Sequence, residues 1–211
     1  MHKYFFFMVL FFMMHPFSGF SQQEKMSDTE KNLLRKKIIE KSRSINTIVS
    51  DFEQTKHLDF LSNDIKSSGS LVFKSPDLIK WEYETPFRYS VIFKNEKLYI
   101  NDDGDKSKID LGSNKTFKSL NGLIIKSVKG DMFDDDKFQM EYAKSKSDYI
   151  IKFTPKDASL KALIHDFILS FDRVSLEVVE IKMMENTEDY TLIKFIGQKI
   201  NSKVNEEVFN N

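Results

Sequence analysis

The sequence predicts a mostly β, α+β fold in which amphipathic helices cover a strongly curved antiparallel sheet. Many short segments alternate apolar and polar residues with a period of two, and two longer segments carry apolar residues at helical spacing. No linker and no fixed-period repeat divides them. Such a meander curls into a barrel or a strongly bent sheet. A filled barrel and a half-open sheet enclosing an apolar cavity both fit this pattern.

Residues 1–21 have the composition of a signal peptide. A basic start precedes an apolar run over residues 4–14, and small residues stand at Gly19 and Ser21, just before the expected cleavage site. The run is shorter than the roughly 20 residues that a membrane-spanning helix needs, which disfavours the alternative of an N-terminal anchor. We therefore expect a cleaved signal peptide and a single mature domain over residues 22–211.

Charge and cysteine content narrow the possible environments. The chain has 32 basic and 32 acidic residues, so it offers no argument for binding nucleic acid, which favours a clustered basic face. It has no cysteine, so burial rather than disulfides must stabilise the exported domain. A bacterial lipoprotein carries its lipid on a cysteine at the cleavage site. We therefore expect this chain to travel free in the periplasm.

The first expected helix runs from Ser27 to Ser42. Ser27 and Glu30 have the spacing of a capping box, in which each side chain bonds the backbone of the other residue. Leu34 and Ile38 form the centre of an apolar stripe. An ordinary helix packed on a core and a movable lid are equally consistent with this stripe.

Strands are expected wherever the alternation has a period of two. They lie around Leu71–Phe73, Ile79–Tyr83, Ser90–Phe93, Lys97–Asn101, Phe138–Tyr142, Tyr149–Phe153, His165–Phe171, Leu176–Met183 and Tyr190–Gln198. Residues 94–96, 102–104 and 185–187 have the composition of turns between them.

The second expected helix interrupts this run of strands at residues 116–129. Phe117, Leu120, Ile124 and Val128 recur at helical spacing, and Leu123 stands beside them. Two amphipathic helices and one curved sheet leave few arrangements, so we expect the helices to cover the concave face.

The motif search favours binding over catalysis. The two histidines after the signal segment, His57 and His165, lack neighbours at metal-ligand spacing. The acidic runs at 131–136 and 101–105 lack the ligand pattern of a calcium loop and are interpreted as turns. No nucleophile, phosphate or dinucleotide motif is present. We expect no catalytic residue, no metal and no cofactor. An apolar passenger is expected instead, because burying hydrocarbon gains about 0.8 kcal/mol per CH₂.

Three segments carry a resemblance to a known family. They are Phe52-Glu53-Gln54-Thr55-Lys56, the block from Gly69 to Pro86 with Leu71, Phe73, Pro76 and Trp81, and Lys94-Asn95-Glu96-Lys97-Leu98-Tyr99-Ile100. This pattern resembles the periplasmic outer-membrane lipoprotein carrier family, the LolA-like proteins, over most of residues 28–209. The resemblance implies an incomplete antiparallel β-barrel with a helical lid. It also implies a carrier, and no enzyme, that collects lipoproteins by their acyl chains from an inner-membrane ABC-type release complex and hands them to an outer-membrane acceptor of unknown identity.

The resemblance also assigns expected roles to residues. The lipid-binding cavity would be lined by Leu71, Phe73, Ile79, Trp81, Tyr83, Ile92, Tyr99, Phe138, Met140, Ile151 and Phe153. The lid would be formed by Leu34, Ile38, Phe117, Leu120, Leu123 and Ile124. A monomer is expected.

The sequence departs from the family pattern at one position of the central block. Better-known members have an arginine directly before the proline, where this chain has Ser75. Lys74 is no simple substitute, because neighbouring residues on a strand point to opposite faces. Two alternatives stay open: a lipid-sensing regulator with the same cavity fold, and a carrier of other lipids or acylated molecules.

Overall fold

The computed structural model describes residues 24–111, 122–123 and 125–210. The described strands form one antiparallel sheet of twelve. They are β1 (Glu24–Lys25), β2 (Thr47–His57), β3 (Ile65–Lys74), β4 (Leu78–Thr85), β5 (Tyr89–Lys94), β6 (Lys97–Asp102), β7 (Asp105–Asp110), β8 (Phe138–Lys144), β9 (Asp148–Pro155), β10 (Asp166–Asp172), β11 (Val178–Met184) and β12 (Tyr190–Ile200). The helices are α1 (Asp28–Arg43), α3 (Ala158–Lys161) and the 3₁₀ turn η1 (Glu206–Phe209). Residues 122–123 and 125–129 are also helical and are called the mid-chain helix below.

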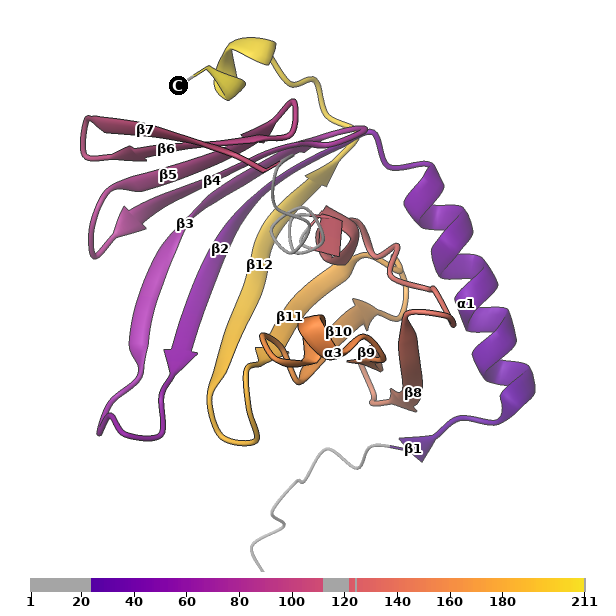
Figure 1. Cartoon of the computed structure of the whole chain (residues 1–211). Helices are drawn as coiled ribbons and strands as arrows, with labels where there is room; N and C mark the ends of the chain where they lie inside the picture. The colour runs from indigo at the N-terminus through magenta and orange to yellow at the C-terminus, as the bar shows by residue number, and fades with distance from the viewer. Residues whose placement is uncertain (1–23, 112–121, 124, 211) are drawn as a thin grey trace, which may run out of the picture.

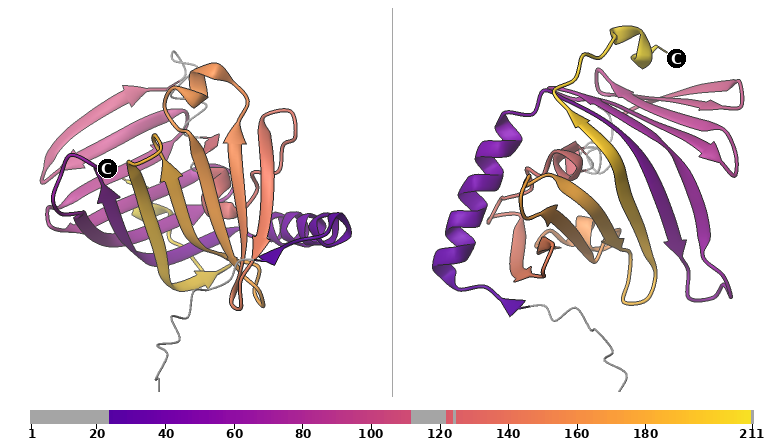
Figure 2. Two further views of the ribbon diagram at one scale, coloured as in Figure 1. Left: turned by 90° about the horizontal axis from the view of Figure 1, so that it is seen from below. Right: turned by 180° about the vertical axis from the view of Figure 1, so that it is seen from behind.

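The sheet is strongly curved but not closed. Its strand order is β1-β8-β9-β10-β11-β12-β2-β3-β4-β5-β6-β7, so β1 and β7 are its two edges. In Figures 1 and 2 the sheet wraps around the mid-chain helix, while α1 runs beside β8. Of the two arrangements left open by periodicity, the half-open sheet is the one observed.

Strand register assigns the two faces of the sheet. Residues directly opposite each other on neighbouring strands share a face, and successive residues alternate between faces. Trp81 of β4 lies opposite Leu71 of β3 and Val91 of β5. These residues belong to the face that carries the main buried cluster, together with Leu34 and Ile38 of α1. We call this the inner face and the opposite one the outer face.

The N-terminus of α1 has the predicted capping box. The backbone N–H of Ser27 donates to the Glu30 carboxylate at 2.8 Å, and the N–H of Glu30 donates to Ser27 Oγ at 3.4 Å. Leu34 and Ile38 are buried, which confirms the apolar stripe. The helix extends one residue beyond the predicted end, to Arg43.

The predicted turns connect hairpins, and five elements were not among the predicted helices and strands: β1, β2, β7, α3 and η1. Asn95 and Glu96 adopt positive φ between β5 and β6, as a tight hairpin turn requires. Strand β7 escaped prediction because all its residues are exposed and largely charged, so it shows no apolar alternation. One-turn elements such as α3 and η1 are too short to establish a period. Within the described ranges, no helix has the length and apolar character needed to cross a membrane.

The C-terminal turn η1 packs on the outer face. Phe209 is 2% exposed, and its carbonyl accepts from Lys94 Nζ at 3.4 Å. Glu206 forms an ion pair with Lys74 at the end of β3. Lys74 thus points to the outer face, away from α1 and the mid-chain helix, in agreement with the sequence argument that it is no simple substitute for an arginine at position 75.

Candidate apolar binding site

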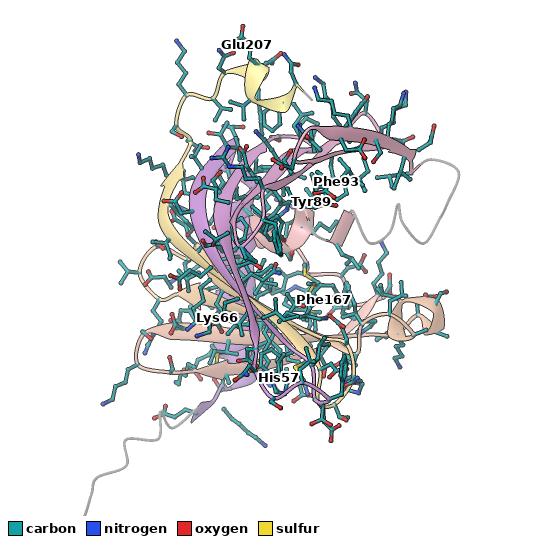
Figure 3. All side chains as sticks on the ribbon, turned by 90° about the vertical axis from the view of Figure 1, so that its left-hand side faces the viewer. His57, Lys66, Tyr89, Phe93, Phe167 and Glu207 are labelled. Carbon is teal, nitrogen blue, oxygen red and sulfur yellow. The ribbon has the colours of Figure 1, made fainter. Side chains whose placement is uncertain are left out.

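An apolar pocket of about 220 Å³ lies between the inner face of the sheet and the end of the mid-chain helix. Its lining residues come from five strands and that helix: Gln54, Trp81, Tyr83, Tyr89, Val91, Phe93, Ser127, Ile181, Met183 and Ile193. In Figure 3, Tyr89 and Phe93 lie together on one part of the sheet, whereas Phe167 lies in another part. The pocket is somewhat smaller than the roughly 300–1,000 Å³ of common small-molecule sites.

Period-two alternation on β4 and β5 builds one wall of this pocket. Trp81 lies directly opposite Val91, and Tyr83 opposite Tyr89. Because opposite residues share a face, all of them point to the inner side.

Aromatic contacts from β2 hold this wall in place. The ring of Phe52 meets Trp81 edge-on with centroids 5.0 Å apart, and it meets Tyr83 in the same way at 5.1 Å. Such edge-to-face pairs favour defined ring positions. The wall is therefore preformed.

The described lining of the pocket contains no charged side chain. Its polar groups are the Gln54 amide, the two tyrosine hydroxyls and Ser127. Burial, reinforced by the nearby Tyr89, raises the pKa of Tyr83 above its usual value. Burial and the nearby Asp102 likewise raise the pKa of Tyr89. Both tyrosines therefore stay neutral at physiological pH, and the pocket suits an uncharged, apolar ligand.

The C-terminal end of the mid-chain helix is fixed against the sheet. The helix ends at Gly130, which has φ +77°, and Asp131 N–H donates back to the Lys126 carbonyl at 2.8 Å. A Cβ atom at Gly130 would lie 2.9 Å from the Phe171 ring and 3.2 Å from Val178. Glycine thus allows both the left-handed conformation and the close approach at this point.

A second hollow of about 480 Å³ lies beside residues 122–126 of the same helix. It is lined by Gly122, Leu123, Lys126, Lys137, Phe138, Asp157 and Leu160. Its walls come from the mid-chain helix, β8 and the α3 segment, so it lies beside a different part of the sheet from the first pocket. The mid-chain helix therefore borders two hollows, the first through Ser127 and the second through Gly122, Leu123 and Lys126.

Helix α1 is attached to another part of the sheet by three ion pairs. Arg35 pairs with Asp135 at 2.6 Å, just before β8. Lys41 pairs with Glu177 at 3.0 Å, just before β11, and Glu30 pairs with Lys144 of β8 at 2.8 Å. Leu34 and Ile38 are buried in the core cluster and line neither hollow. Of the two roles left open for α1, this arrangement fits a helix packed on a core.

The structure places the predicted cavity residues in three groups. Trp81 and Tyr83 line the first pocket, and Phe138 lines the second hollow. The rest of the inner-face group packs into or against the core cluster without lining either hollow: Leu71, Phe73, Ile79, Met140, Ile151 and Phe153. Of the predicted lid residues, Leu123 lines the second hollow, while Phe117, Leu120 and Ile124 lie outside the described residues.

Ile92 and Tyr99 require a correction. Ile92 lies opposite Lys80, one position out of step with Trp81, and Tyr99 lies opposite Ile92. Both residues therefore point to the outer face and cannot line the inner pocket. Ile92 is nevertheless buried, at 1% exposure, so its apolar character reflects burial on the outer face of the sheet.

Most of the pocket lining was not selected from the sequence. Val91 and Phe93 belong to a predicted strand, but only the register with β4 shows that they, and not Ile92, share the face of Trp81. Gln54 belongs to the quoted Phe52–Lys56 motif, and its polar side chain gave no sign of a place in an apolar pocket. The remaining apolar lining lies on β11 and β12, which are far from β4 in the sequence: Ile181, Met183 and Ile193.

The residues considered for chemistry have structural partners. His57 Nδ1 lies 2.8 Å from Asp64 Oδ1, and its ring stacks on Tyr190. His165 Nδ1 lies 2.9 Å from Asp166 Oδ2. In the acidic run, Asp134 accepts backbone hydrogen bonds from residues 136 and 137, as expected for a turn. Over the described part of the chain, no three His, Cys, Asp or Glu residues gather as a metal site would need.

The structure thus combines an open, curved sheet with a preformed apolar pocket beside a helix, an arrangement suited to binding an apolar ligand. Comparison with known proteins identifies the family of the chain. The sequence profile described as outer membrane lipoprotein carrier protein LolA matches residues 43–211. The chain therefore belongs to the LolA family, as the sequence resemblance predicted.

The solved structures that are similar to this chain share little sequence identity with it. An uncharacterized conserved protein from Thermus thermophilus has a TM-score of 0.50 and 5% identity, over 82% of this chain and 91% of that one. A LolA superfamily protein from Nitrosomonas europaea gives 0.43 and 8%, over 84% and 97% of the two chains. The Mycobacterium tuberculosis lipoprotein LppX gives 0.47 and 11%, over 85% and 99%. A search of curated proteins gave no match.

Proposed function

We propose that this protein is a periplasmic carrier that binds the acyl chains of lipoproteins released from the inner membrane and delivers them to the outer membrane. The observation that carries the proposal is the uncharged apolar pocket around Trp81, in a chain of the LolA family. The signal-peptide pattern of residues 1–21 supports export. The activity is binding and release, and no bond in the cargo is made or broken.

Hydrocarbon burial supplies the binding energy. Each CH₂ group moved from water into the pocket contributes about 0.8 kcal/mol, so ten groups contribute about 8 kcal/mol before the cost of ordering the chain is subtracted. Affinity of this size holds a lipid tail in water. It also allows release to a partner that offers a larger apolar surface.

The size of the pocket requires a change of shape for larger cargo. About 220 Å³ accommodates part of one acyl chain, whereas a lipoprotein carries two or three. The mid-chain helix borders both this pocket and the second hollow, and its last turn is fixed at Gly130. A displacement of residues 122–127 would enlarge the apolar space, with Gly130 as the fixed point.

A charged substitution in the pocket tests the proposal. Val91→Asp places a carboxylate among apolar groups and should reduce capture of a diacylated or triacylated lipopeptide at least tenfold in native mass spectrometry. Val174→Asp makes the same change at a side chain that is 94% exposed and should leave capture unchanged. Circular dichroism checks that both variants fold. Equal capture by the two folded variants, or no lipopeptide on the unmodified protein, would contradict the proposal.

The partners follow from the same proposal. Cargo would come from an ABC-type release complex of the inner membrane and pass to an outer-membrane acceptor, with the carrier acting as a monomer. Depletion of the protein should therefore leave lipoproteins at the inner membrane. Normal lipoprotein sorting after depletion would reject this pathway even if the purified protein binds acyl chains.

A further inference from the structure

The polar groups of the apolar pocket are all neutral, and one of them is oriented by a neighbour. Tyr83 Oη donates to Gln54 Oε1 at 3.0 Å, across the inner face between β4 and β2. The Tyr83 ring is itself held edge-on by Phe52 at 5.1 Å. The hydrogen bond from Tyr83 to the carbonyl oxygen therefore fixes the orientation of the Gln54 amide.

This contact leaves the N–H donors of the Gln54 amide for a ligand. A glutamine amide has two N–H donors besides its carbonyl oxygen. Among the described residues, the contact with Tyr83 is the hydrogen bond that the Gln54 side chain makes, and it uses the oxygen. Because Gln54 lines the pocket and its oxygen is bonded to Tyr83, its N–H donors remain for a bound molecule.

We infer that Gln54 donates a hydrogen bond to the carbonyl oxygen of the ligand's acyl ester or amide, so that the pocket selects bound acyl groups over free fatty acids. This inference rests on the proposed function and specifies what the pocket recognises. A neutral carbonyl accepts from Gln54 without bringing in a charge. A free carboxylate would lose its hydration beside a lining whose described residues offer no cation. Tyr83 is then a positioning residue, because it acts through Gln54.

Three twelve-carbon ligands separate the possibilities: glycerol monododecanoate (ester), 1-O-dodecylglycerol (ether, without the carbonyl) and dodecanoate (carboxylate). Trp81 is the one tryptophan in the sequence and lines the pocket, so its fluorescence reports binding. We expect the ester to bind about fivefold more tightly than the ether, as one neutral hydrogen bond allows. Dodecanoate should bind least tightly at pH 8.

Substitutions of Gln54 and Tyr83 test whether these residues cause the preference for the ester over the ether. Gln54→Leu should lower the ratio of ester to ether affinity from about five to about one. Tyr83→Phe should reduce the ester-to-ether ratio, which a purely structural role would not change. Gln139→Leu, the same change at an exposed position of β8, should keep the full ratio.

The outcomes distinguish this inference from the proposed function. Equal binding of ester and ether to the unmodified protein, or unchanged selectivity in folded Gln54→Leu and Tyr83→Phe, would overturn the inference while acyl binding stands. Failure of all three ligands to change Trp81 emission would overturn both.

Discussion

Two regions of this molecule use the same kinds of residue to opposite effect. In the filled region, formed by α1, β9, β10 and the part of β8 after Phe138, inner-face side chains such as Ile151, Phe153 and Phe167 are fully buried. In the hollow region, formed by β4, β5 and the end of the mid-chain helix, Tyr83, Val91 and Phe93 are only partly buried and line a pocket. Apolar composition alone therefore does not distinguish a core from a binding site.

The position of α1 explains the difference. Its ion pairs attach it to β8 and to the loops before β8 and β11, so it packs over that side of the curved sheet. Figure 1 shows β4 and β5 curving away from α1 on the far side of the mid-chain helix. Among the residues that the structure describes, no long helix fills the inner face of β4 and β5. The hollow arises from the curvature of the sheet together with the attachment of α1 at one side.

Replacing a phenylalanine by alanine in each region should give the largest difference in unfolding free energy. Phe153 is fully buried and meets Phe133 and Phe138 edge-on, so Phe153→Ala should cost about 3–5 kcal/mol of unfolding free energy. Phe93→Ala enlarges a hollow that already exists and should cost clearly less. Urea unfolding measures both. Equal losses would mean that β5 is packed as tightly as β9.

Adding side-chain volume should also destabilise the filled region more than the hollow region. Ile151→Phe overfills the filled region and should cost about 1–3 kcal/mol. Val91→Phe grows into the pocket, so it should change the unfolding free energy by less than about 1 kcal/mol while lowering acyl affinity several-fold. The comparison fails if Val91→Phe destabilises as much as Ile151→Phe, or if it binds acyl ligands normally.

Ligand binding should also affect the two regions differently, because only the hollow region is expected to move. Spin labels at Lys36 of α1 and Glu141 of β8 occupy exposed positions of the filled region, and we expect their distance to stay constant when acyl cargo binds. Labels at Lys126 of the mid-chain helix and Ser90 of β5 should move apart. Pulsed electron paramagnetic resonance gives both distances. Separation of the first pair instead would identify α1 as the moving cover.

Lowering the pH should give the smallest change in stability, and this change should come from the filled region. The hydrogen bond from Lys144, with those from Ser27, lowers the pKa of Glu30 from 4.5 to about 2. A lowered folded-state pKa stabilises the fold above pH 4.5, and this contribution is lost as the pH falls from 4.5 toward 2. Glu30→Gln removes that titration and should flatten the dependence of stability on pH in this window. Glu40→Gln, on the exposed face of the same helix, should not.

The sequence was sufficient to predict the class of fold and most of its elements. The capping box at Ser27, the alternation around Trp81 and the hairpin turn at Asn95 are local signals, and each was found where it was predicted. The motif block around Trp81 also pointed to the correct family. These features depend on neighbours within a few residues, which a single sequence displays directly.

The site was only partly predictable because it depends on distant pairings. Trp81 and Tyr83 were chosen correctly as inner-face residues of β4, but Ile92 was chosen where Val91 and Phe93 line the pocket. A shift of one residue exchanges the faces of a strand, and the short predicted segment Ser90–Phe93 is apolar on both faces. Contributions from β2, β11 and β12 depend on the strand order of the curved sheet, which periodicity does not contain.

Quenching of Trp81 tests the central claim most directly. A diacylated lipopeptide with bromine atoms on its acyl chains should quench the fluorescence of this single tryptophan to saturation, because heavy atoms inside the pocket would contact the indole. The same lipopeptide without bromine should bind with equal affinity and quench far less. Binding of the brominated lipopeptide, shown by native mass spectrometry, without quenching of Trp81 would place the acyl chains elsewhere and contradict the account.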